Sequence, residues 1–111
     1  YMAFCSSRER SLLLRLALER KFFEDQIVSS NYEWRVALRR TRKRGYATRL
    51  AKADPFTNSL AVPIILEPNP VVATPGVTYF RKVVNRAKIG LIASALKREA
   101  ALAADLIRQR M

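Results

Sequence analysis

The chain has 111 residues, among them no histidine, one cysteine and three glycines, and half of it is hydrophobic. Lys and Arg number 21 against 9 Asp and Glu, which gives a formal net charge of +12. This composition excludes histidine general-base catalysis, a Cys/His zinc site and a disulfide within the chain. It is too apolar for a disordered basic tail, and it lacks a run of about 18 uncharged apolar residues, so we expect no membrane-spanning helix.

The sequence begins at Tyr1 rather than at a methionine. Removal of an Arg-rich import leader would leave such an end, and so would a start inside a longer product. The first alternative predicts a protein of the mitochondrial matrix, and the second leaves the cytoplasm as the expected compartment.

Residues 6–45 carry helical signals. Ser6 and Glu9 have the spacing of a capping box. Behind this cap, apolar residues recur at steps of four and seven, which keeps them on one stripe of a helix: Leu12, Leu16, Phe23, Ile27, Trp34 and Leu38. We predict one long helix over 6–45 that ends at Gly45, because glycine adopts the left-handed end conformation freely.

A second capping box, from Ser30 to Glu33, allows a break in this helix. The apolar stripe stays in phase across that point. We therefore predict a kink near 29–31 within a single helix, with a new helix after a short break as the alternative.

Residues 46–76 hold all five prolines of the chain, with apolar residues between them. Proline blocks both a helix interior and a central strand, so we predict an extended, polyproline-like segment. An apolar strip of this kind needs a cover, and two helices leave it little surface. We expect a neighbouring protein to cover it, and the predicted protein-binding residues are Leu60, Val62, Ile64, Ile65, Leu66, Val71 and Val72.

Residues 77–110 predict a second long helix, with Thr74 and Pro75 as its cap and first turn. Its apolar stripe again steps by four and seven: Phe80, Val84, Leu91, Ala95, Leu102 and Leu106. Gly90 lies inside this helix and admits two interpretations. It is either a tolerated irregularity, or part of a small-residue strip with Ala87 and Ser94 that another backbone approaches closely.

Taken together, these elements predict a mainly α fold of two long amphipathic helices joined by an extended Pro-rich apolar segment. Such a fold has little core of its own. We expect residues 1–111 to form a single non-catalytic unit.

Positive charge is concentrated in two places. Eight Lys and Arg and no acid lie between residues 34 and 53, and six Lys and Arg and no acid lie between residues 81 and 98. Like charges at this density repel, and a polyanion relieves that repulsion and gains from counterion release. The predicted RNA-binding residues are Arg35, Arg39, Arg40, Arg42, Lys43, Arg44, Tyr46, Arg49, Lys52, Arg81, Lys82, Arg86 and Lys88. An acidic protein, anionic lipid or bare solvent are the alternatives.

The sequence offers no catalytic constellation. Cys5 has no histidine partner, Glu24 and Asp25 are adjacent on a helix and point to different faces, and no Gly-rich phosphate loop is present. We expect no enzyme activity, no metal, no cofactor and no small-molecule substrate.

Basic charge, long helices and an extended apolar strip favour a structural RNA-binding subunit of a large ribonucleoprotein. A ribosomal protein that contacts rRNA phosphates and neighbouring subunits is the leading hypothesis, with the mitochondrial ribosome as one candidate. The alternative is a peripheral accessory subunit of a mitochondrial respiratory or ATP synthase complex, lying against anionic lipid or acidic subunits. A third, weaker hypothesis is a basic helical partner of an acidic protein or an assembly factor.

Overall fold

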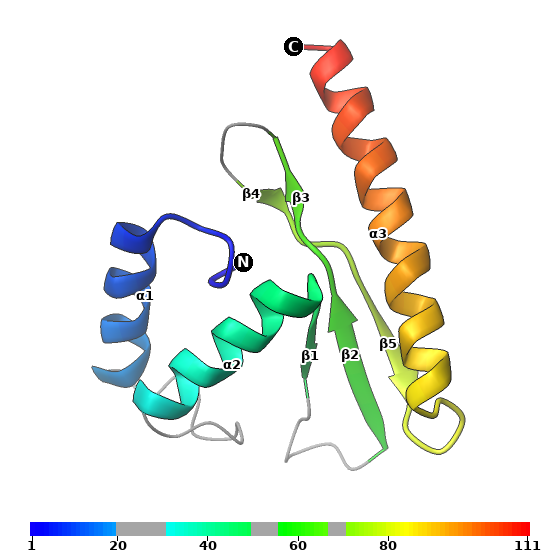
Figure 1. The fold of residues 1–111 in the computed structure, drawn as a ribbon, viewed down its shortest axis with the longest axis horizontal. Coiled ribbons are helices and arrows are strands. Elements are labelled where there is room, and N and C mark those ends of the chain that lie inside the picture. Colours follow the sequence, from blue (N-terminus) through cyan, green and yellow to red (C-terminus); the bar gives the residue numbers. More distant parts are fainter. Residues whose placement is uncertain (20–30, 50–55, 67–70) are drawn as a thin grey trace.

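The computed structural model of the chain describes residues 1–19, 31–49, 56–66 and 71–111, which form three helices and five strands (Figure 1). Helices α1 (Ser7–Glu19) and α2 (Asn31–Arg44) come first. Five short strands follow, and the long helix α3 (Arg86–Gln109) ends the chain. None of the described helices combines the length and apolarity needed to cross a bilayer.

The N-terminal part has a small core of its own. Ala3, Leu14 and Leu38 are buried together, and Phe4 and Trp34 pack against them. These residues come from the N-terminal segment, α1 and α2. The cluster therefore holds the two helices to each other through the first residues of the chain.

The predicted cap of α1 is confirmed, because the Glu9 amide donates to the Ser6 hydroxyl over 3.1 Å. The predicted stop at Gly45 is also confirmed: α2 ends at Arg44, and Gly45 has φ +80°. The prediction of one helix over 6–45 was wrong, because α1 and α2 run in different directions (Figure 1). The proposed kink near 29–31 falls mostly outside the described residues.

The sheet combines strands β1 (Ala47–Arg49), β2 (Thr57–Ala61) and β5 (Gly76–Phe80), all antiparallel in the order β1-β2-β5. A smaller hairpin of β3 (Ile64–Ile65) and β4 (Val71–Ala73) continues it. Pro63 lies between β2 and β3, and Pro75 between β4 and β5. These two prolines interrupt the strands at their ends, where no ladder hydrogen bond needs their missing N–H. The extended segment that we predicted as polyproline therefore forms hydrogen-bonded strands.

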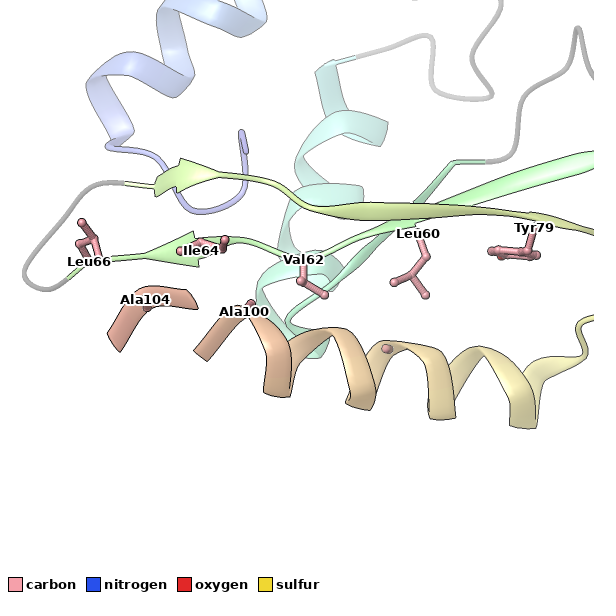
Figure 2. Close-up of a cluster of buried hydrophobic side chains, with 8 residues drawn as sticks. Leu60, Val62, Ile64, Leu66, Tyr79, Ala100 and Ala104 are labelled. Carbon is pink, nitrogen blue, oxygen red and sulfur yellow. The ribbon is translucent and has the colours of Figure 1, made fainter. Parts of the chain in front are cut away.

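Helix α3 covers one face of this sheet. Figure 2 shows Leu60, Val62, Ile64 and Tyr79 on the strand side of the cluster and Ala100 and Ala104 on α3. Leu60 and Val62 are each only 1% exposed. Small alanines let the helix backbone approach the sheet, and the larger strand side chains fill the space between them.

The predicted second helix over 77–110 was wrong at its start, because β5 occupies residues 76–80. Asn85 is the actual cap of α3, and its side chain accepts from the Lys88 amide over 2.9 Å. The predicted apolar stripe of α3 was also wrong. Leu91, Leu102 and Leu106 are 72%, 54% and 59% exposed, whereas the alanines on the opposite face are buried.

The fold is therefore not mainly α with little core. Helix α3 and the antiparallel strands enclose one hydrophobic core, and the apolar strip supplies the middle of it. Helices α1 and α2 pack around the second, smaller core. Leu60, Val62, Ile64 and Leu66 lie in that core, Val71 is buried elsewhere, Ile65 is half-buried and Val72 is exposed. The strip is covered by the chain's own α3, so the premise that it needs a neighbouring protein was wrong.

Candidate functional site

The face of the sheet turned away from α3 is a candidate site. Because side chains alternate along a strand, residues that pair across the three strands lie in rows on one face. The strand register places Ala47, Ala61 and Gly76 in one such row, and Arg49, Ser59 and Thr78 in the next. Thr57 and Phe80 follow in a third row. The first row therefore holds small residues, the second holds polar side chains, and the third includes an aromatic ring.

The polar row is a connected set of hydrogen-bonding groups. The Ser59 and Thr78 hydroxyls are 3.1 Å apart. The Arg49 guanidinium donates to the Ser59 hydroxyl over 3.4 Å. Arg49 and Thr78 are exposed and Ser59 is half-buried, so among the described residues no side chain covers this row.

The row of small residues beside the Arg49 row carries no side chain larger than a methyl group. A side chain is not tolerated at Gly76, since a Cβ there would lie 2.7 Å from the Leu60 carbonyl oxygen. On the other side, the Phe80 ring is 66% exposed. A guanidinium and two hydroxyls suit a carboxylate, and a neighbouring ring suits an apolar group attached to it.

The predicted RNA-binding residues lie on several different elements. Arg35, Arg39, Arg40, Arg42, Lys43 and Arg44 are exposed along α2, while Arg86 and Lys88 are exposed in the first turn of α3. The Lys97 ammonium donates to the Arg44 carbonyl, so the end of α2 contacts α3 near the middle of α3. Lys97 and Arg86 are 11 residues apart, about 16 Å along a helix. Lys52 lies outside the described residues, and Lys82 is exposed after β5.

Other predicted residues serve the fold. The Arg81 guanidinium donates to the Asn58 side chain over 2.8 Å, and the Lys88 ammonium donates to the Val83 carbonyl over 3.2 Å. Tyr46 packs against the core. The Arg44 guanidinium lies over the Tyr46 ring, 4.6 Å from the ring centre. Arg49 belongs to the open sheet face rather than to the α2 cluster.

Ser59 and Thr78 were missed by the sequence analysis. The strand signal in the sequence was weak: residues 57–61 are three polar residues followed by two apolar ones, and only Val77, Thr78 and Tyr79 alternate between apolar and polar within 76–80. The prolines at the ends of these runs hid it, because they favoured a polyproline reading of the whole segment.

Comparison with known proteins concerns the fold alone. No protein-family model matches the chain, and no curated protein does. Among solved structures, the repressor BlcR of Agobacterium tumefaciens superposes with a TM-score of 0.65 at 18% identity, over 70% of this chain. An IclR transcriptional regulator from Alicyclobacillus acidocaldarius superposes with a TM-score of 0.64 at 20% identity, over 80% of this chain.

The chain shares its fold with part of two transcription regulators. It spans 32% of the BlcR chain and 38% of the Alicyclobacillus regulator. The expectation of a ribosomal protein, or of a mitochondrial respiratory subunit, was wrong, because the matching structures are regulators. That expectation also rested on a fold of two helices, whereas the chain has three helices and five strands in its described residues. The mitochondrial or cytoplasmic location stays a prediction.

Proposed function

We propose that this chain is a non-catalytic unit of a transcription regulator and that it binds a small carboxylate on the open face of the β1-β2-β5 sheet. The likeness in fold to two regulators supports the first half of the proposal. The second half rests on the hydrogen-bonded row of Arg49, Ser59 and Thr78.

The chemistry of the row favours an anion of small size. The Arg49 guanidinium brings a fixed positive charge and several N–H donors, and whichever hydroxyl accepts in the Ser59–Thr78 bond keeps its own O–H to donate to a ligand. The adjacent row of Ala47, Ala61 and Gly76 has no side chain beyond a methyl group, which leaves room for the body of the ligand. A regulator unit with such a site would report the level of a metabolite carrying a carboxylate.

Amide chemical-shift titration with acetate, succinate and inorganic phosphate tests this site. We expect carboxylate-dependent shifts in β1, β2 and β5, and Arg49→Gln to weaken binding by about tenfold or more, because a hydrogen bond to a charged group is lost. Arg86→Gln removes one positive charge from an exposed position on α3 and is the matched control. Shifts that are absent from the three strands, or equal affinity in Arg49→Gln, would contradict the proposal.

A second candidate function rests on α2. Arg39, Arg40, Arg42 and Lys43 are all exposed within five residues of the same helix. Such a cluster contacts DNA phosphates without reading sequence, and it would hold a regulator on its duplex.

Gel retardation of a random-sequence DNA duplex over a salt series tests this second function. We expect replacement of these four residues by Gln to weaken binding by about tenfold or more at low salt and to flatten the salt dependence, because fewer counterions are released. The matched control replaces Arg86, Lys88, Arg98 and Arg110 by Gln, which removes the same charge from α3 and its end. An equal loss in both variants would mean that total charge, and not the α2 cluster, binds DNA.

A further inference from the structure

We propose that a groove on the other side of the sheet, between α3 and β3, binds an amphipathic carboxylate: a carboxylate group attached to an apolar tail. This site goes beyond the proposed function, because it lies on the α3 side and shares no residue with the Arg49 row. Three features of the described lining support the groove as a binding site: its floor is apolar, one end carries the positive charge of Lys97, and no lining acid lies at that end.

The floor of the groove is apolar. It has a volume of about 460 Å³, and its apolar lining includes Phe4, Pro63, Ile65, Ala100, Ala101 and Ala104. Three charged residues also line it: Lys97, Asp105 and Arg108. Phe4 belongs to the N-terminal cluster, whereas Ala100 and Ala104 belong to the core under α3. The groove therefore follows the junction between the two cores, where apolar side chains meet without a side chain of the described residues filling the gap.

Lys97 and Gly45 line one end of the groove, and Arg44 precedes Gly45 in the chain. The Arg44 guanidinium lies 4.6 Å and the Lys97 ammonium 5.3 Å from the centre of the Tyr46 ring. The Lys97 ammonium also donates to the Arg44 carbonyl, which fixes its position. Two positive charges close to one ring repel each other, and an anion bound near both would offset this repulsion.

The other end of the groove is neutral. Asp105, the one acid among the described lining residues, pairs with the Arg108 guanidinium over 3.0 Å. The same guanidinium donates to the Ile65 carbonyl over 3.4 Å. The positive charge that lacks an acidic neighbour in the groove is thus at Lys97, and this asymmetry gives the ligand a direction: carboxylate at Lys97 and Arg44, tail along the alanines towards Ile65.

An amphipathic ligand fits this arrangement better than a purely polar anion. Inorganic phosphate or acetate would satisfy the two cations and leave the apolar floor exposed to water. An apolar tail buries that floor, and burial of apolar area is the main source of affinity for a small ligand in a shallow groove.

Octanoate is a suitable probe, with octanol as the uncharged probe of the same length. We expect isothermal titration calorimetry of the 111-residue chain to show octanoate binding, and octanol to bind at least about tenfold more weakly. We also expect Lys97→Gln and Arg44→Gln each to weaken octanoate binding by about tenfold. Equal affinity for octanoate and octanol, or no effect of both substitutions, would overturn the site.

A second pair of variants separates the groove from the charges. Ala101 is exposed and lines the groove, so Ala101→Phe fills it without removing a cation. In an Arg49→Gln background, which disables the open sheet face, Ala101→Phe should abolish octanoate binding. Ala95→Phe places the same ring at an exposed position of α3 outside the groove and should leave binding unchanged. Arg49→Gln should also retain octanoate binding, and a loss there would instead assign the ligand to the open sheet face.

Discussion

At the scale of single residues, Gly45 occupies a position that disfavours any side chain. It follows the last residue of α2 with φ +80°, and its amide donates to the Thr41 carbonyl over 2.7 Å. A Cβ there would lie 3.1 Å from Lys97 Cε. Both the left-handed conformation and the crowding oppose a side chain. We expect Gly45→Ala to lower the free energy of unfolding by about 1–2 kcal/mol, measured by urea denaturation.

Gly90 is the contrasting case. It lies inside α3, and a Cβ there would meet nothing within 4 Å, so within the described chain no backbone approaches the strip of Ala87, Gly90 and Ser94. We expect Gly90→Ala to raise the free energy of unfolding by about 0.5–1 kcal/mol, since alanine restricts the unfolded chain and favours the helix. Urea denaturation beside Gly45→Ala makes the comparison. A change in the free energy of unfolding of the same sign for Gly45→Ala and Gly90→Ala would contradict these assignments.

At the scale of elements, α3 is amphipathic in an unusual sense. Its buried face carries Ala93, Ala100 and Ala104, and its exposed face carries Leu91, Leu102 and Leu106. The sheet supplies the large side chains, so the helix must supply small ones where the backbones approach.

A pair of substitutions on α3 tests this orientation. We expect Ala100→Leu to cost about 1–3 kcal/mol through overpacking, and Leu102→Gln to change the free energy of unfolding by at most about 0.5 kcal/mol. Thermal and urea unfolding of both variants measure the difference. A larger loss in Leu102→Gln than in Ala100→Leu would mean that the leucine face is the buried one.

At the scale of the whole molecule, the chain is flat and highly charged. Its extents are 41 × 38 × 20 Å, which fits a sheet covered on one face. The net charge of +12 is spread over this small body. Self-repulsion of that charge destabilises the compact state.

Added salt should therefore stabilise the protein. We expect the Tm to rise when NaCl is increased from about 50 to about 500 mM, because screening shortens the range of the repulsion. Circular dichroism at two protein concentrations measures the Tm and detects association. A fall in Tm over this range would show that attractive ion pairs, and not repulsion, dominate the charged surface.

Local chemistry was readable from the sequence alone. The Ser6 cap of α1 and the Gly45 stop of α2 depend on a few consecutive residues, and both are confirmed. The exclusion of histidine and zinc chemistry needs only the composition. The Arg-rich run that ends at Arg44 predicts a basic surface that binds phosphates, and this stays a prediction.

Only the tertiary structure decided how distant segments meet. Pairing of β2 with β5 brings Ser59 to Thr78, 19 residues along the chain, and no local pattern specifies that register. The same pairing placed the apolar strip in the core and so reversed the predicted faces of α3. The strands supply large side chains, so Ala93, Ala100 and Ala104 are buried while Leu91, Leu102 and Leu106 are exposed. Capping depends on neighbours in sequence, whereas burial depends on which surface arrives from elsewhere in the chain.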